Sequence, residues 1–191
     1  MSHYLYRTEG FLLDGFEYGE DSRGYFLLTR DLGLVAALAQ GVRLLKSKLR
    51  YSLGYGTALS VELIRGRSSW RLVSAESAST TFQDEKAKMY KRVGNLIRRL
   101  VHGEEKNEKL FLAFSDLNAF LTESGLSNEE INILELISVA RVLSALGYWG
   151  GNDIPEKFLK EPLKKELLPE AQTESEKLTI AVNRALRESH L

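Results

Sequence analysis

Up to about residue 81, apolar positions come in short runs separated by turn residues, a spacing typical of β-strands. The clearest run spans residues 57–65, where Leu59, Val61 and Leu63 alternate with other side chains. Similar runs, bounded by glycine or polar residues, are found over the following ranges: 10–19, 24–29, 34–39 and 70–77. Five strands in about 80 residues, with no long helix, predict a small closed barrel of the five-stranded OB type, although an SH3-like barrel would give a similar pattern.

Beyond residue 82 the apolar spacing becomes that of amphipathic helices. One apolar stripe occupies residues 89–101 and ends near Gly103. A second occupies residues 110–121 and is closed by Gly125. Glycine just past the last apolar position is a common helix stop, so each stripe predicts one helix.

Two further helices are predicted from their starts. Ser127 with Glu130, and Thr173 with Glu176, have the spacing of a capping box, in which two side chains and two backbone amides satisfy one another. Residues 150–172 hold all three prolines, and we predict a long connection there with one short helix.

An α+β architecture follows: an OB-type barrel over residues 1–81 and then a helical domain over residues 82–191. The chain of 191 residues is long enough to bury a core in both, and 43% hydrophobic with 27% charged residues is ordinary for a globular protein. Its 26 basic and 26 acidic residues cancel, so overall charge favours no class of partner and only local charge is informative.

The absence of cysteine excludes disulfides, thiolate zinc sites and cysteine nucleophiles, and it suits a reducing cytosol. The first ten residues lack the apolar core of a signal peptide. No apolar run approaches the ~20 residues that span a bilayer. We therefore expect a soluble cytoplasmic protein without a membrane partner.

Catalytic chemistry is poorly represented. The three histidines, His3, His102 and His190, do not share metal-ligand spacing, and the phosphate-binding and serine-hydrolase motifs are missing. Acid pairs fall in predicted loops or first helical turns, where the helix dipole favours them; they are Glu20–Asp21, Asp84–Glu85, Glu104–Glu105 and Glu129–Glu130. We expect no enzyme, no catalytic residue, no metal and no cofactor.

One segment has a strongly unbalanced charge. Residues 40–52, "QGVRLLKSKLRYS", carry four cations and no acid. A second cluster, "RGRSSWR" at 65–71, follows on the far side of a predicted strand, and the two could converge at one end of the barrel. As a strand, the first segment would place Lys46, Lys48 and Arg50 on one face; as a helix, Arg43, Lys46 and Arg50.

Aromatic residues lie among these cations: Tyr51, Tyr55 and Trp70, with Tyr25 and Phe26 on another strand. OB barrels hold single-stranded nucleic acid with backbone-tracking cations beside stacking aromatics. Two plainer interpretations remain, because the cations could form a solvated loop and Tyr55 and Trp70 could belong to the core. The predicted nucleic-acid-binding residues are Arg43, Lys46, Lys48, Arg50, Arg65 and Arg67, with Arg23 and Arg71 as secondary members.

The order of these motifs resembles the opening of the bacterial RecO family. The resemblance rests on Thr8–Glu9–Gly10, Tyr18–Gly19–Glu20, Leu28–Thr29–Arg30, Gly33–Leu34, Gly41, Arg43 and the stretch Lys46 to Arg50. Residues 96–114 and 139–150 are similar to the first helical pair and an L-G-Y helix end of that family, so the resemblance covers about 150 residues.

The resemblance implies a recombination mediator in DNA repair, associated with the nucleoid and without an active site. Such proteins bind single- and double-stranded DNA and anneal complementary strands. They work with RecR, contact the C-terminal tail of single-stranded-DNA-binding protein, and help load RecA onto coated strands. If about five phosphates are neutralised, the log–log dependence of affinity on salt has a slope of roughly −4.

One departure limits the resemblance, because many members carry a zinc-binding cysteine cluster after the L-G-Y segment and this chain has no cysteine. The zinc site is therefore excluded. Two other functions remain open: a non-catalytic adaptor of the same pathway whose basic patch faces acidic protein, and an RNA-binding OB module.

Overall fold

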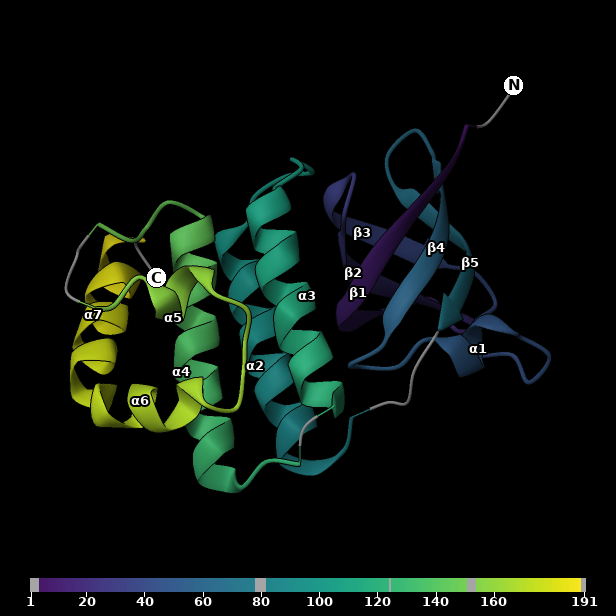
Figure 1. The fold of residues 1–191 in the computed structure, drawn as a ribbon. Helices are drawn as coiled ribbons and strands as arrows, with labels where there is room; N and C mark the ends of the chain where they lie inside the picture. Colours follow the sequence, from purple (N-terminus) through teal and green to yellow (C-terminus); the bar gives the residue numbers. More distant parts are fainter. Residues whose placement is uncertain (1–3, 78–81, 124, 151–153, 190–191) are drawn as a thin grey trace. The chain divides into compact units, whose positions relative to one another are not determined.

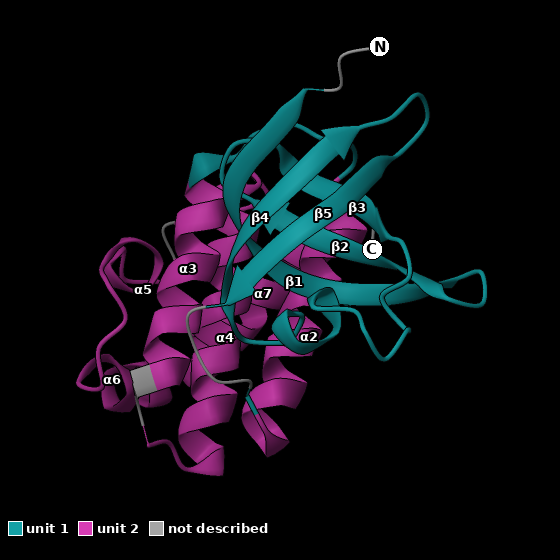
Figure 2. Cartoon of the chain, turned by 90° about the vertical axis from the view of Figure 1, so that its right-hand side faces the viewer, with its two compact units in different colours: residues 1–82, 102–108 teal, residues 83–101, 109–191 magenta. Residues whose placement is uncertain are grey.

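The computed structural model describes residues 4–77, 82–123, 125–150 and 154–189. The chain forms two compact units (Figure 2), the first made of Met1–Phe82 with His102–Glu108 and the second of Gln83–Val101 with Lys109–Leu191. Residues 102–108 thus belong to the barrel unit although they follow the first long helix.

The first unit is a closed five-stranded barrel (Figure 1), as predicted. Its strands are β1 (Leu5–Tyr18), β2 (Ser22–Thr29), β3 (Gly33–Ala39), β4 (Ala58–Arg65) and β5 (Trp70–Ser77). They are joined in the order β1-β2-β3-β5-β4, and β3 with β5 is the one parallel pair among them. This order is that of an OB-type barrel and confirms the predicted fold class.

β1 closes the barrel because it is long enough to pair on both sides. Its first half pairs with β4, from Leu5 opposite Ile64, and its second half pairs with β2 as far as Tyr18 opposite Ser22. A bulge between Leu12 and Asp14 shifts the register in the second half. Bulges bend and twist a strand, which is what a strand shared by two edges of a closed barrel requires.

Alternation along the strands builds the barrel core, as predicted for β4. Leu59, Val61 and Leu63 are all buried, and Trp70 and Leu72 of β5 join them in one apolar cluster. The barrel therefore has a packed interior.

Residues 40–57 connect β3 to β4 and are here called the basic loop. Turns occupy residues 40–46, and the single helical turn α1 spans Leu49–Ser52. Val42 is buried, and Leu49, Leu53 and Tyr55 pack against the barrel core. The basic loop is thus pinned by its apolar residues while its cations face outward.

The second unit is helical. It contains α2 (Asp84–Leu100), α3 (Glu108–Glu123), α4 (Asn128–Ala145), α5 (Lys157–Lys160), α6 (Leu167–Thr173) and α7 (Ser175–Glu188). α4 is the central helix and packs against α2, α5, α6 and α7 (Figure 1). The capping box at its start is confirmed: Glu130 N donates to Ser127 Oγ at 3.2 Å, and Ser127 N donates to Glu130 Oε2 at 2.8 Å.

Two expectations about the C-terminal region were wrong. Thr173 does not cap the last helix, because it is the final residue of α6 and its hydroxyl donates back to Pro169 O at 3.1 Å. Glu174 takes the N-cap position of α7 without a side-chain cap bond. The proline-containing connection holds two short helices, α5 and α6, where one was expected.

Candidate nucleic-acid interface

The four cations of the basic loop are all exposed, and they differ in their partners. Arg43 is neutralised locally: it forms an ion pair with Glu17, and its Nη1 donates to the Glu20 carbonyl at 3.3 Å. Its backbone amide also donates to Asp21 O at 3.0 Å, so the start of the basic loop is tied to the acidic β1–β2 turn.

Lys46, Lys48 and Arg50 are different. Their side chains are exposed, and no ion pair or hydrogen bond is recorded for them with any described residue. Three positive charges that lie within five residues and have no acid nearby in sequence are available to a polyanion.

The basic loop adopts neither of the two regular geometries considered for it. Leu44 N donates to Gly41 O at 3.1 Å and Ser47 N to Leu44 O at 3.0 Å, so successive turns precede α1. Gly41 has φ +64°, a value that favours glycine. The cations are therefore presented from a turn-rich loop, not in a row along one face of a strand or long helix.

The cations of the second cluster lie on neighbouring positions of β4 and β5 and in the turn between them, and they have different partners. Arg71, early in β5, donates from Nη2 to Gln40 Oε1 at 2.9 Å and so lies beside the start of the basic loop. Arg65, at the end of β4, pairs with Glu104, and its guanidinium lies 4.8 Å from the centroid of the Trp70 ring. Arg67 is exposed in the β4–β5 turn.

Strand pairing brings Arg23, Arg71 and Arg65 to one end of the barrel. Arg23 is paired with Ala39 and Arg71 with Leu38, so both lie at the end of β3 from which the basic loop starts. Arg65 ends β4 opposite Trp70, and its neighbour Ile64 lies opposite Arg71, so Arg65 also lies near the start of the basic loop, while β4 separates it from the end of that loop by about 23 Å of strand.

Arg23 has an environment unlike that of a surface cation. It shares the inward side of β2 with Tyr25, its Nε is buried without a hydrogen-bond partner, and it lies within 3.0 Å of the position a Cβ on Gly15 would take. Its guanidinium is 5.8 Å from the centroid of the Tyr25 ring. Arg23 is placed to fill the end of the barrel.

Two tyrosines, Tyr25 and Tyr55, lie near Arg23, and burial changes the pKa of both. Burial raises the pKa of Tyr55 above its ordinary value, and the charge of Asp14 raises it further. Burial likewise raises the pKa of Tyr25, while the charge of Arg23 opposes this change. This cluster holds the last part of the basic loop, through Tyr55, against β1 and β2.

Most aromatics considered as stacking platforms belong to the core. Trp70 and Tyr25 are buried, and Phe26 packs on Phe16 with ring centroids 5.1 Å apart. Tyr51 of α1 is the exception, since it is exposed. Sequence reasoning missed Leu45, which is also exposed, because a Leu-Leu pair looks like core in a sequence.

The described residues contain no group of three or more His, Cys, Asp or Glu side chains that could hold a metal ion. His3 and His190 lie outside the described residues. Among the helices that the structure describes, none is long and apolar enough to cross a membrane.

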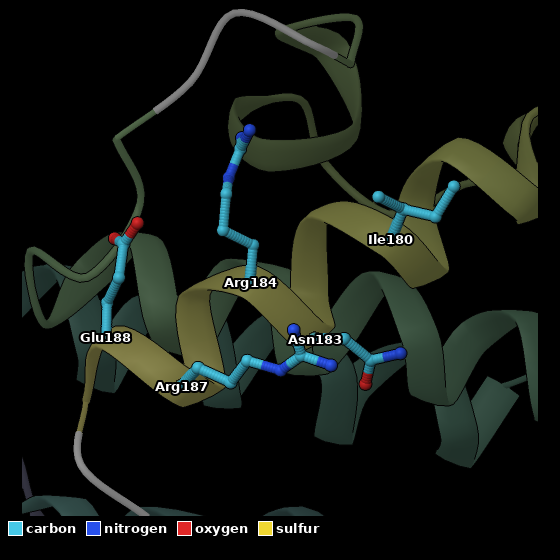
Figure 3. Close-up of a pocket in the computed structure, with 5 residues that line it drawn as sticks. All are labelled: Ile180, Asn183, Arg184, Arg187 and Glu188. Atoms are coloured by element: carbon cyan, nitrogen blue, oxygen red, sulfur yellow. The ribbon is translucent and has the colours of Figure 1, made fainter.

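Two of the hollows on the helical unit combine apolar surface with charged side chains. A groove of about 500 Å³ between α3, α4 and α5 is lined by Lys109, Leu112, Ala113, Asp116, Arg141, Ser144, Ala145, Leu159, Lys160 and Pro162. An open hollow on α7 (Figure 3) is lined by Ile180, Asn183, Arg184, Arg187 and Glu188.

Comparison with known proteins assigns the barrel. Residues 1–81 match the family described as "Recombination protein O N terminal". The barrel is similar to the N-terminal domain of RecO proteins. The chain is also similar to proteins named DNA repair protein RecO from three organisms. It is 36% identical to that of Rubrobacter xylanophilus over 73 residues, 30% to that of a Synechococcus strain over 117 and 26% to that of Chlorobium limicola over 151.

These alignments cover 38%, 61% and 75% of this chain respectively. They cover 29%, 41% and 56% of the three RecO proteins, so the chain spans between about a third and a half of the relatives it matches. The longest alignment extends the similarity to RecO well beyond the barrel.

Several of the residues that carry the RecO resemblance hold β1 against the β2–β3 turn. Thr8 Oγ1 donates to Asp31 Oδ2 at 2.7 Å, and Arg30 forms an ion pair with Glu9 at 2.6 Å. Buried Thr29 donates to Gly33 O at 2.8 Å. These motif residues of RecO type therefore have a structural role here, and the basic loop carries the unpaired charge.

Proposed function

We propose that this protein is a non-catalytic, DNA-binding recombination mediator that acts in DNA repair at the nucleoid. The observation that carries the proposal is the basic loop: Lys46, Lys48 and Arg50 are exposed and without a recorded partner, on an OB barrel of RecO type. The names of its relatives, DNA repair protein RecO, support the same pathway.

The physical basis is phosphate neutralisation. Two complementary strands repel each other through their phosphates, and cations that neutralise both backbones favour annealing while leaving most bases free to pair. The groups that do this need a fixed position and exposure, and the basic loop supplies both because Val42 and Leu49 pin it to the barrel. No step of this process requires an active site.

The proposed partners are single- and double-stranded DNA, RecR, the C-terminal tail of single-stranded-DNA-binding protein and, indirectly, RecA. A protein tail with acidic and apolar residues suits the groove between α3, α4 and α5, where Leu112 and Leu159 lie between Lys109 and Lys160. Lys160 pairs with Glu156, so Lys109 is the lysine of this groove that has no ion pair among the described residues.

Fluorescence anisotropy with a labelled single strand of about 30 nucleotides, across a salt series, tests the DNA-binding part. The variant Lys46→Ala/Lys48→Ala/Arg50→Ala removes the unpaired charges of the basic loop. Lys164→Ala/Lys177→Ala/Arg187→Ala is a matched control, since it removes three exposed cations of the helical unit.

We expect salt-dependent binding whose log–log slope falls by about 2 in the loop variant, as the loss of three single-strand phosphate contacts predicts. The control is expected to keep the wild-type slope. Absence of binding by the folded wild type at low salt would reject the mediator and favour an adaptor for acidic protein. A strong preference for RNA over DNA of the same sequence would favour the RNA-binding module.

A labelled tail peptide of single-stranded-DNA-binding protein tests the groove separately. Leu112→Asp places a negative charge in the groove, and Ile180→Asp places one on α7 as a control. Loss of peptide binding in the first variant alone supports the groove; equal binding by both variants would place the tail elsewhere.

A further inference from the structure

The basic loop exposes apolar side chains as well as cations. Leu45 is 82% exposed and Tyr51 is 79% exposed, and Leu44 is partly exposed beside them. These residues flank the unpaired cations Lys46, Lys48 and Arg50 in the sequence, Leu44 and Leu45 before them and Tyr51 after them. The outward surface of one short loop therefore carries two kinds of group.

These apolar side chains are exposed although the basic loop is anchored to the barrel. The basic loop sends Val42, Leu49 and Leu53 inward to the barrel core, and Arg43 fixes its start to the β1–β2 turn. Its apolar residues thus divide into an inner set with partners and an outer pair, Leu45 and Tyr51. Leu45 and Tyr51 therefore point outward from a loop whose neighbouring residues are fixed to the barrel.

Charge complementarity selects the occupant of this surface. A partner that satisfies three cations must be anionic, and one that also covers Leu45 and Tyr51 must present apolar faces close to its charges. Single-stranded nucleic acid does this, because every nucleotide carries one phosphate and one base whose face can stack on an aromatic ring or pack on an aliphatic one.

An anionic membrane surface would also offer charge beside apolar groups, but it fits this loop less well. Membrane-surface segments are amphipathic helices with a continuous apolar face. The regular part of the basic loop is the single turn α1, and its outward residues Arg50 and Tyr51 are one cation and one aromatic.

We propose that Leu45 and Tyr51 contact unpaired bases of a DNA strand whose phosphates lie on Lys46, Lys48 and Arg50. This inference rests on the proposed function and adds the base-contacting residues to it. Single strands are then preferred to duplex, since paired and stacked bases do not expose their faces to Leu45 and Tyr51. The basic loop holds one or two bases and leaves the remainder of the strand free to pair.

The test compares oligothymidylate of 30 nucleotides with an abasic strand of the same length, which keeps the phosphates and lacks the bases. The variant is Leu45→Ala/Tyr51→Ala. Tyr4→Ala/Ile180→Ala is the matched control, since it removes one exposed tyrosine and one exposed aliphatic residue, 77% and 68% exposed. Both variants alter only surface side chains, and unchanged thermal unfolding verifies their folding.

We expect the Leu45→Ala/Tyr51→Ala variant to bind oligothymidylate about tenfold or more weakly than wild type, with the same salt slope, because stacking contacts are lost and phosphate contacts are kept. It is expected to bind the abasic strand as wild type does. A strand with 2-aminopurine at successive positions gives an independent signal, since stacking on Tyr51 quenches its fluorescence in wild type and not in the variant.

If the Leu45→Ala/Tyr51→Ala variant lost affinity equally for both strands, or for neither, the inference would be overturned. Salt-dependent binding by the wild type would still support the proposed function in that case. The inference would also be overturned if the Leu45→Ala/Tyr51→Ala variant lost the binding of wild type to vesicles rich in phosphatidylserine and kept wild-type affinity for DNA. That result would assign the surface to membranes. Failure of wild type to bind any strand would reject both proposals together.

Discussion

Arg43, the first cation of the basic loop, forms an ion pair with Glu17 at the end of β1. The sequence separates these residues by 26 positions, yet the β1–β2 turn and the start of the basic loop are joined by a backbone hydrogen bond as well. The acidic turn thus offsets one of the four charges of the loop.

Replacement of Glu17 by Gln is therefore expected to strengthen DNA binding. The change releases Arg43 to a phosphate, so we expect affinity to rise a few-fold at low salt and the salt slope to steepen by about 0.7 for a single strand. Anisotropy across a salt series measures both. Glu156→Gln, which removes the acid of an exposed pair on the helical unit, serves as the control, and an equal gain in both variants would contradict a local role for Arg43.

Arg23 is expected to behave unlike the cations of the basic loop. Arg23→Met keeps the apolar stem and removes the charge, and because Arg23 faces the end of the barrel we expect an unchanged salt slope for DNA binding. Lys46→Met is expected to lower the magnitude of that slope by about 0.7. The same drop in both variants would show that Arg23 reaches the DNA.

In the helical unit, Arg141 is expected to be the most sensitive ionic site. Its Nε donates to Phe158 O at 2.7 Å, its Nη1 to Asp116 Oδ2 at 2.6 Å, and its Nη2 to Glu161 O. Burial lowers the pKa of Arg141, while Asp116 opposes the change by favouring the charged form. The guanidinium thus fixes the chain around α5 to α4.

Arg141→Met leaves two carbonyls without their donor and removes the cation from the Asp116 carboxylate, which keeps the Leu163 amide as a donor. We expect a loss of about 3 kcal/mol in the free energy of unfolding, the order found when one partner of a buried pair is removed. Urea denaturation measures it. The comparison is Arg92→Met, which breaks the more exposed pair with Glu135 and is expected to cost at most about 1 kcal/mol; similar losses in the two variants would refute the structural role of Arg141.

The capping box predicts a dependence on acid pH. The amide of Ser127 donates to the Glu130 carboxylate, which lowers the pKa of Glu130 from its ordinary value near 4.5. A carboxyl whose pKa is lower in the folded state stabilises the fold above its unfolded pKa, and this contribution is lost as pH falls through the folded value. Urea unfolding of wild type and Glu130→Gln at pH 6 and pH 3 measures it, and the difference between them is expected to shrink at pH 3. A constant difference at both pH values would argue against ionisation as the source of the cap's stability.

Sequence patterns correctly predicted the features that depend on interactions between residues close together in the chain. Alternation in β4 identified Leu59, Val61 and Leu63 as core because a strand has two faces, and the spacing of Ser127 and Glu130 identified the start of α4 because a capping box is made within four residues. Thr173 misled because a Thr and a Glu three residues apart also occur where α6 ends at Thr173, and α7 begins two residues later at Ser175 with Glu174 as its N-cap.

The candidate site was less predictable because charge partners are distant in sequence. Arg65 looked free, yet it pairs with Glu104, which lies 39 residues away beyond α2. The orientation of Arg23 depends on the register of a closed barrel, and the exposure of Leu45 depends on which leucines of the basic loop reach the core. None of these follows from the spacing of neighbouring residues.

Residues 102–108 belong to the barrel unit although they follow α2, and this limits how the chain can be cut into separate domains. Glu104 forms an ion pair with Arg65, Lys106 Nζ lies 3.7 Å from Asp31 Oδ1, and the Glu105 carbonyl packs so closely on Gly33 that a Cβ there would clash with it. The backbone therefore passes between the two units three times, at 82–83, 101–102 and 108–109. A fragment that stops at residue 82 loses these three contacts, and no single cleavage releases an intact barrel from the helices.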